Sequence, residues 1–201
     1  MVRQRNRDAA TVRLLRTIQL DVSDTLVFER AATPGEWAVS GSFLFMDDDP
    51  ARLTGKRRAA FRQGFAGVRS LGFSTLAVVT PAQEHEIEQA TQDLAQSLIE
   101  QLGAPDLATA LEAARDEIRF CASLCMNGSE PYPEGTVIAL TRSHEDGEIT
   151  EQFRSLSRRQ ARQAEDDWHS DARAFAIIEV DDTNAIEERI DLVSLVKDPK
   201  Q

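Results

Sequence analysis

The sequence has few of the residues on which metal binding and disulfide bonding depend. It contains two cysteines and three histidines in 201 residues. Cys121 and Cys125 are four residues apart on a predicted helix, which argues against a secreted disulfide scaffold and favours two thiols packed in the core. The histidines, His85, His144 and His169, are not spaced as ligands with either cysteine. We therefore expect no metal site and no bound cofactor.

The short motifs of common enzyme classes are also missing. There is no G-x-S-x-G, no H-E-x-x-H and no C-x-x-C. Gly64 and Gly67 fall inside a predicted helix rather than after a strand, so they do not form a phosphate-binding loop. These absences favour a protein that is not an enzyme.

Long apolar runs are absent as well. No stretch of about 18 apolar residues occurs, the length that a membrane-spanning helix needs. The basic residues at the start are not followed by the hydrophobic core of a signal peptide. The sequence therefore predicts a cytoplasmic protein that does not interact with a membrane.

Positive charge is scarce and unevenly distributed. The net charge is −11, from 23 Lys and Arg against 34 Asp and Glu. Residues 1–73 hold 12 basic and 8 acidic residues, a balance of +4, so residues 74–201 hold the other 11 and 26, a balance of −15. Because nucleic-acid phosphates are bound by Lys and Arg, nucleic-acid binding is not expected of the acidic part. The basic part could bind an acidic partner.

The pattern of apolar residues predicts an α+β domain at 12–156. A mobile basic arm at 1–11 precedes it, and a polar linker at 157–173 and a strand–helix extension at 174–201 follow. The predicted sheet is antiparallel and has about five strands, with a helical hairpin and one further helix on one face. Three of these strands form a meander over 12–45, since apolar residues alternate there and Pro34-Gly35 is typical of a turn.

The helical hairpin is the most strongly predicted part of the chain. Residues 76–79 are an apolar run that suits a buried strand. Thr80, Pro81 and Gln83 then resemble an N-cap, a first-turn proline and a capping-box residue. Gly103 ends the first helix, and Asp106 caps the second. We expect two antiparallel helices packed on the sheet.

A basic helix is predicted over 55–70, and its outer face carries Arg58, Arg62 and Arg69. We expect these three arginines either to be simply solvated or to bind an acidic protein partner. Gly64 and Gly67 weaken this helix, so we expect them to allow close approach of a neighbouring element. The aspartates at 47–49 lack the spacing of a calcium loop and indicate a solvated turn.

The one candidate for catalysis is the turn His144-Glu145-Asp146, which follows a predicted strand over 136–142. A carboxylate next to a histidine raises the pKa of the imidazole into the range useful for acid–base chemistry. The same residues are also typical of a polar hairpin turn, and no nucleophile accompanies them in the sequence. Both interpretations are left open here.

Several segments together resemble a protein family, the domain of unknown function 6505, over roughly residues 13–157. They are Leu15-Arg-Thr-Ile-Gln-Leu-Asp21, Val27-Phe-Glu-Arg-Ala31, Pro34-Gly-Glu-Trp-Ala-Val39, Phe65-Ala-Gly-Val-Arg-Ser-Leu-Gly72, Gly103-Ala-Pro-Asp-Leu107 and Arg142-Ser-His-Glu-Asp-Gly147. The resemblance implies a bacterial protein and supplies no activity. It also implies an accessory role, such as assistance in the maturation or assembly of a redox enzyme.

Two functional hypotheses follow. In the first, the protein is a non-enzymatic cytoplasmic accessory or interaction protein that presents Arg58, Arg62 and Arg69 to an acidic surface of a partner protein. In the second, it is a small enzyme or ligand-binding domain with a pocket near His144, Glu145 and Asp146. Self-association through the apolar face of the sheet is a further alternative.

Overall fold

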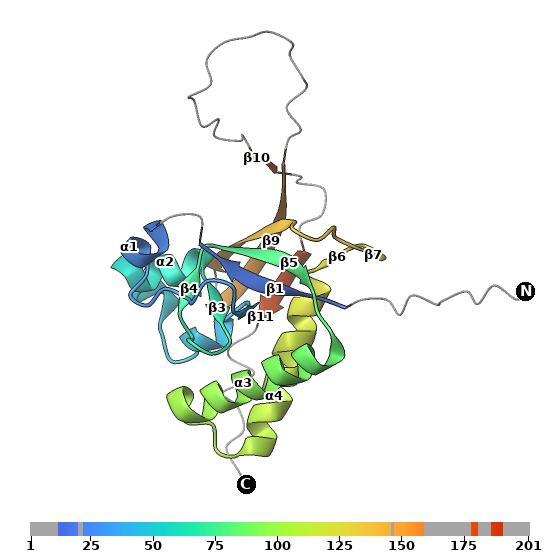
Figure 1. Cartoon of the computed structure of the whole chain (residues 1–201). Helices are drawn as coiled ribbons and strands as arrows, with labels where there is room; N and C mark the ends of the chain where they lie inside the picture. Colours follow the sequence, from blue (N-terminus) through green and yellow to red (C-terminus); the bar gives the residue numbers. More distant parts are fainter. Residues whose placement is uncertain (1–11, 20–21, 146, 159–177, 181–185, 191–201) are drawn as a thin grey trace, which may run out of the picture.

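The computed structural model describes residues 12–19, 22–145, 147–158, 178–180 and 186–190 (Figure 1). It is an α+β fold, as predicted, but its main sheet has nine strands rather than about five. In chain order the elements of the first half are β1 Arg13–Ile18, α1 Ser23–Val27, β2 Trp37–Val39, η1 Ser42–Phe45, η2 Pro50–Arg52, α2 Gly55–Gln63, β3 Phe65–Gly67, β4 Phe73–Ser74 and β5 Leu76–Pro81. Those of the second half are α3 Glu84–Leu102, α4 Leu107–Ser123, β6 Met126–Asn127, β7 Glu130–Pro131, β8 Val137–Glu145, β9 Glu148–Arg158, β10 Ile178–Val180 and β11 Ile186–Ile190.

The main sheet is antiparallel, and its strand order is β10-β9-β8-β5-β1-β2-β3-β4. β11 also pairs antiparallel with β9, over residues 149–153. β5 lies between β1 and β8, so the two strands predicted from the apolar runs at 76–79 and 136–142 are neighbours. A separate two-stranded sheet is formed by β6 and β7.

The core lies where α4 and the end of α2 meet one face of the sheet. Leu140 pairs with Phe153, and the Phe153 ring packs against Phe120 of α4 with 5.7 Å between centroids. Arg142 lies two residues after Leu140, so its side chain leaves the same face. Its guanidinium donates to the carbonyls of Phe61 and Gly64 at the end of α2.

Two elements of the predicted meander are different in the structure. The second strand of the meander, predicted over residues 25–30, is wrong, because residues 23–27 form the short helix α1. In this helix the buried carboxylate of Asp24 accepts a hydrogen bond from the Thr75 hydroxyl at 2.7 Å. The third strand ends at Val39, because Gly41 takes a positive φ of 80° and turns the chain into η1. Phe45 is thereby fully buried and packs against Phe61.

The predicted helix over 55–70 is too long. α2 ends at Gln63, since Gly64 is extended and the chain then enters β3. A Cβ on Gly64 would lie 2.6 Å from the Phe73 ring, and one on Gly67 would lie 2.1 Å from a Glu36 oxygen. The expected close approach at both glycines is therefore confirmed, but it occurs at the helix end and in a strand.

The helical hairpin of α3 and α4 is confirmed. Gly103 has a left-handed φ of 70°, and the Asp106 side chain accepts from the Thr109 amide at 2.9 Å. The predicted start of the first helix is wrong by a few residues. β5 continues to Pro81, where it still pairs with β1, and the capping box is formed by Gln83 and Glu86.

The structure of the C-terminal part differs in part from the prediction. The predicted linker begins in β9, which extends to Arg158. The strand of the extension predicted at 174–201 is found at Ile178–Val180, and Ile186–Ile190 is a strand rather than the expected helix. Both strands pair with β9. The basic arm and the rest of the linker and extension lie outside the described residues.

Candidate functional site

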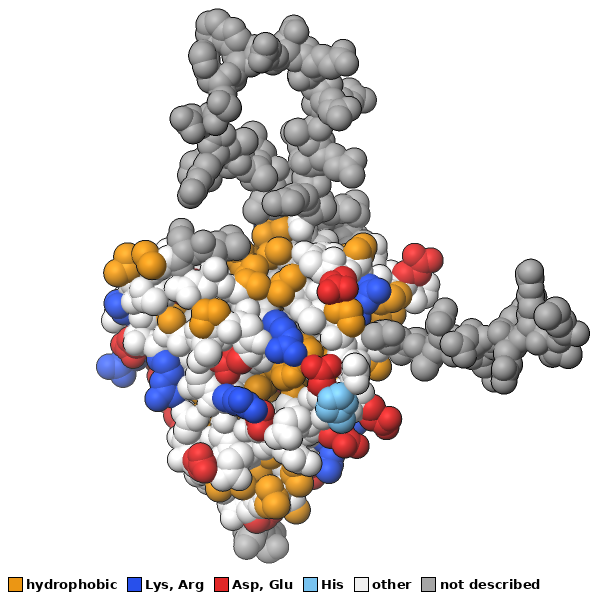
Figure 2. All heavy atoms as spheres, in the orientation of Figure 1, with side chains coloured by type: hydrophobic (Ala, Val, Ile, Leu, Met, Phe, Trp, Pro, Cys, Tyr) orange, Lys and Arg blue, Asp and Glu red, His pale blue; other side chains and the backbone are white. Residues whose placement is uncertain are grey.

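A group of exposed basic side chains lies on η2 and α2, and we call it the basic surface. Its members are Arg52, Lys56, Arg58 and Arg62, all exposed. None of the four is in an ion pair with a described residue, and residues 50–63 include no acidic residue. Figure 2 shows Lys and Arg side chains at the left edge of the molecule, over the part where Figure 1 draws α1 and α2.

The neighbouring Arg57 has a structural role, because its side chain contacts the segment before η2. Its guanidinium pairs with Asp48, donates to the carbonyl of Leu44 and lies over the ring of Phe45, with its central carbon 4.3 Å from the ring centroid. Asp49 caps η2 by accepting from the Ala51 amide at 3.1 Å. Two of the three consecutive aspartates thus hold the start of the basic surface in place.

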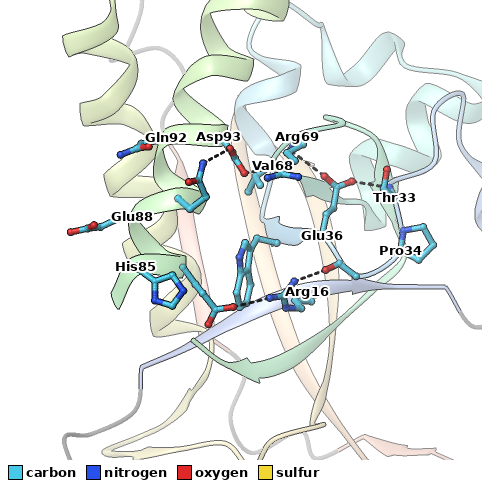
Figure 3. Close-up of a pocket in the computed structure, with 14 residues that line it drawn as sticks. Arg16, Thr33, Pro34, Glu36, Val68, Arg69, His85, Glu88, Gln92 and Asp93 are labelled. Atoms are coloured by element: carbon cyan, nitrogen blue, oxygen red, sulfur yellow. Dashed lines mark hydrogen bonds and ion pairs between the residues drawn. The ribbon is translucent and has the colours of Figure 1, made fainter. Parts of the chain in front are cut away.

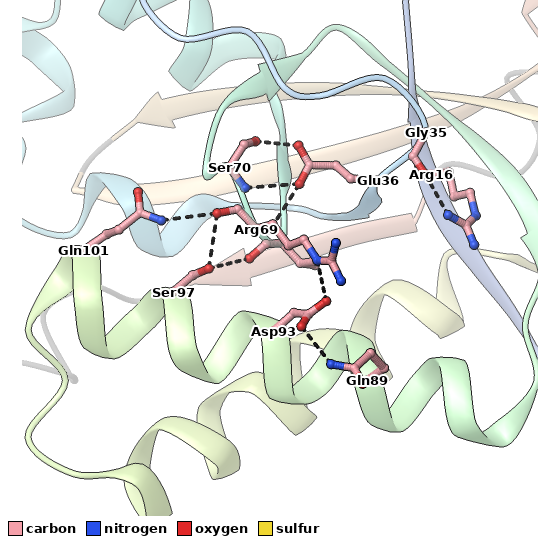
Figure 4. Close-up of polar contacts among 10 residues, drawn as sticks. Arg16, Gly35, Glu36, Arg69, Ser70, Gln89, Asp93, Ser97 and Gln101 are labelled. Carbon is pink, nitrogen blue, oxygen red and sulfur yellow. Dashed lines mark hydrogen bonds and ion pairs between the residues drawn. The ribbon is translucent and has the colours of Figure 1, made fainter.

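Arg69 is not on the same helix as Arg58 and Arg62, which corrects the predicted three-arginine face. It lies in the turn between β3 and β4 (Figure 4), and its Nε donates to the Asp93 carboxylate on α3 at 2.6 Å. This carboxylate raises the pKa of Arg69 by a hydrogen bond and by direct attraction. The charge of Arg69 is therefore already balanced within the molecule.

The turn that carries Arg69 is built around a single carboxylate. Glu36 accepts hydrogen bonds from the backbone amides of Arg69 and Ser70, both at 3.1 Å, and from the Ser70 hydroxyl. The side chains of Ser97 and Gln101 on α3 donate to the carbonyl of Arg69, at 3.3 and 3.2 Å (Figure 4). Local charge and backbone donors therefore fix this turn against α3.

Arg69 borders a pocket of about 690 Å³ that we call the polar cleft. Figure 3 shows Arg16, Glu36, Arg69, His85 and Asp93 around it. Arg16 stacks on Trp37, with 3.5 Å between its central carbon and the ring centroid, and its Nη2 lies 3.4 Å from a Glu86 oxygen.

The polar cleft does not carry an excess of positive charge. Two arginines and four carboxylates line it, namely Arg16, Arg69, Glu36, Glu86, Glu88 and Asp93. Both arginines are paired with a carboxylate of α3. The cleft is therefore a polar surface with more acidic than basic groups, and an anionic ligand would have to displace an existing partner of an arginine.

The predicted catalytic turn is the tip of the hairpin between β8 and β9. His144 is half-buried at the end of β8, opposite Ile149, and Glu145 is exposed. Asp146 lies outside the described residues. Neither His144 nor Glu145 lines the polar cleft or the pocket between η1 and the helical hairpin.

A buried ion pair that the sequence analysis missed lies two residues before His144. Arg142 of β8 and Glu151 of β9 are both fully buried and pair with each other. Arg142 also donates to the carbonyls of Ser40, Phe61 and Gly64, so it connects the sheet with α2. The alternation Ile138, Leu140, Arg142 was the available signal, since it places the arginine on the buried face.

Both cysteines are buried, as predicted. Burial raises the pKa of Cys121 well above its ordinary value and that of Cys125 to about 12, so both remain thiols. Within the described part of the chain, no group of three or more His, Cys, Asp or Glu side chains is placed to hold a metal ion. No helix in that part is long and apolar enough to cross a membrane.

Comparison with known proteins identifies a family. The model of a family of unknown function, DUF6505, matches residues 12–174, which is most of the chain. No significant match is found among curated proteins or among solved structures. The chain belongs to the DUF6505 family.

Proposed function

We propose that this protein is a non-enzymatic interaction protein and that an acidic surface of a partner protein docks on its basic surface. The observation that carries the proposal is that Arg52, Lys56, Arg58 and Arg62 are exposed and have no ion pair with a described residue. Unpaired exposed charges of one sign attract an oppositely charged partner and accelerate its association.

This surface differs from the predicted one because it lacks Arg69 and includes Arg52 and Lys56. Arg69 is excluded, because Asp93 already balances its charge. Arg58 and Arg62 are one helical turn apart on α2 and form the centre of the proposed contact. Their side chains project from a helix whose end is held to the sheet by the hydrogen bonds of Arg142.

The cellular setting of this function is also a proposal. We place the protein in the cytoplasm, in an accessory role that is consistent with assisting the maturation or assembly of a redox enzyme. The partner would then be a folded protein that exposes a cluster of Asp and Glu. A test with a defined acidic probe is possible before that partner is known.

The first experiment measures binding of a fluorescent oligoglutamate peptide by anisotropy. We expect wild-type protein to bind the peptide and to release it as salt is raised, because exposed ion pairs are screened. Arg58→Glu combined with Arg62→Glu should abolish binding. The matched control is Arg115→Glu with Arg119→Glu, which changes the net charge equally on an exposed face of α4.

Equal loss of binding in both double variants would overturn the proposal, since it would show a response to net charge alone. So would retention of binding by the Arg58 and Arg62 variant. Affinity capture from the native cytoplasm with the same two variants then identifies the partner. It should be retained by the control and lost from the α2 variant.

A further inference from the structure

A second pocket, of about 580 Å³, lies between η1 and the helical hairpin, and we call it the Glu117 pocket. Its size is in the range of small-molecule sites. Its walls are predominantly apolar and include Phe43, Leu44, Met46, Leu94, Leu98 and Ala110. Met46 is 52% exposed, although it is large and apolar, so an apolar ligand would remove unfavourable surface from water.

The polar group of this pocket is the half-buried carboxyl of Glu117 on α4. One of its oxygens accepts from the Ser40 hydroxyl at 3.1 Å and from the Gly41 amide at 3.3 Å. Burial, and then repulsion from Glu151, raise the pKa of Glu117 to about 7. The carboxyl is therefore held in place by the protein but is incompletely neutralised.

The described residues around the pocket carry charge of one sign. They include Glu117 and Asp47 but no Lys or Arg. Among the described residues, Arg142 is a positive charge that acts on Glu117, but its donors are committed to Glu151 and three backbone carbonyls. A positively charged ligand atom would supply the positive partner that the carboxyl group of Glu117 lacks.

We propose that the Glu117 pocket binds a small molecule with an apolar body and an amine, and that the amine faces the carboxyl group of Glu117. The apolar body packs between η1 and the two helices. The ammonium group donates a charge-assisted hydrogen bond to the carboxylate, which is stronger than a bond between neutral groups. The proposal is independent of the basic surface on α2.

The test compares two probes of equal chain length, n-octylamine and n-octanol, by calorimetric titration of the full chain at pH 8. Both fill the apolar walls, but only the amine can pair with Glu117. We expect the amine to bind about tenfold more tightly than the alcohol, a difference that corresponds to one charge-assisted contact. Backbone NMR shifts should change at Leu98 and Ala110, which line the pocket.

Three variants separate the possible explanations. Glu117→Gln keeps the shape and should reduce amine affinity to the level of the alcohol. Glu112→Gln, on an exposed position of the same helix, should leave both affinities unchanged. Ala113→Trp fills the mouth of the pocket and should abolish binding of both probes.

Three results would overturn the proposal. The first is equal affinity of the two probes for wild-type protein. The second is an amine preference that persists in Glu117→Gln. The third is the absence of shifts at the pocket residues at millimolar probe, which would show that the probes bind elsewhere or not at all.

Discussion

The polar cleft and the Glu117 pocket both contact α3, but this helix presents very different residues to each. It presents His85, Glu86 and Asp93 to the polar cleft and Leu94, Leu98 and Leu102 to the Glu117 pocket. Figure 3 shows His85 and Asp93 on the α3 side of the cleft, with Arg16, Glu36 and Arg69 on the other side. A single amphipathic helix therefore separates a charged surface from an apolar one.

The two pockets show how a carboxyl group behaves in two different environments, Asp93 in the first and Glu117 in the second. In the polar cleft, Asp93 meets an arginine whose side chain is 70% exposed, so water shares in solvating the pair. Around Glu117, two carboxyl groups share one fully buried arginine, Arg142. One negative charge is then left over in a partly buried site, and binding a proton relieves it.

The largest expected effect is at the buried arginine. Arg142→Met removes the partner of Glu151 and the donors to three backbone carbonyls, leaving a buried charge uncompensated. We expect the free energy of unfolding to fall by about 3–5 kcal/mol. Urea unfolding measures the change.

The control for this prediction is Arg115→Met on the exposed face of α4. It should have almost no effect on urea unfolding, because the exposed side chain makes no ion pair with a described residue. A loss below about 1 kcal/mol for Arg142→Met would mean that the core does not depend on the pair. The proposed difference between the solvated ion pair of the polar cleft and the buried arginine near Glu117 would then be wrong.

Two glycines give the next largest effect, since each borders one of the regions under comparison. Gly41, which donates to Glu117, and Gly35, which lines the polar cleft, have nearly equal φ values of 80° and 81°. A Cβ on Gly41 would lie 2.6 Å from the Cβ of Ala66, whereas one on Gly35 would meet no atom within 4 Å. The two positions therefore separate backbone strain from crowding.

We expect Gly41→Ala to lower the free energy of unfolding by about 3 kcal/mol, from strain and overpacking together. Gly35→Ala should cost about 1 kcal/mol, from strain alone. Urea unfolding of both variants gives the difference. Equal losses would show that the region beside Glu117 is as open as the polar cleft.

The dependence of stability on pH sharpens the comparison further. The folded protein raises the pKa of Glu117 to about 7 from an ordinary value of 4.5, so between these values the folded state binds a proton that the unfolded state has lost. Stability from this group therefore falls as pH rises from about 4.5 to about 7 and is then constant. Glu151, Arg142 and Cys121 are the charged or titratable groups that act on it.

The measurement is urea unfolding of wild type and Glu117→Gln at pH 5 and pH 8. Wild-type stability relative to the variant should fall by roughly 2 kcal/mol over this interval, after allowing for the partial exposure of the carboxyl. The other titrating groups are common to both proteins and cancel. Parallel pH profiles would show that Glu117 is ionised throughout the interval and contradict its assigned environment.

The sequence predicted the features that local chemistry determines. Gly103 and Asp106 mark helix ends through their own backbone and side-chain preferences, and both were placed correctly. Arg58 and Arg62 were correctly assigned to an exposed face, because their spacing of four residues is that of one helical turn.

The remaining features depend on contacts between distant residues. Arg69 fits the same helical spacing, but α2 ends at Gly64, whose environment is set by Phe73 in β4. In the sequence, Glu117 looks like one more acidic residue on a polar helix face. Its environment is set by Ser40 and Gly41, which precede η1 and donate hydrogen bonds to it. Phe43 and Phe45 alternate as in a strand, yet Gly41 turns them into a helical segment.

The smallest effect is expected at the paired charge of the polar cleft. Asp93→Asn removes the ionic partner of Arg69, but the turn keeps its hydrogen bonds to Glu36, Ser97 and Gln101. The change in the free energy of unfolding should therefore lie within the roughly 10–15% uncertainty of urea extrapolation. An NMR shift of the Arg69 Nε–H resonance would show that the pair has nonetheless been lost.

Ser97→Ala is the matched variant, one helical turn further along α3. The Ser97 hydroxyl is buried and donates to the carbonyl of Val68 at 2.8 Å, so its removal leaves an acceptor without its donor. We expect a loss of about 1 kcal/mol. If Asp93→Asn destabilises the protein as much as Ser97→Ala does, the ion pair rather than the neutral hydrogen bonds organises the cleft. The polar cleft would then depend on charge as strongly as the region around Glu117, and the distinction between the two would disappear.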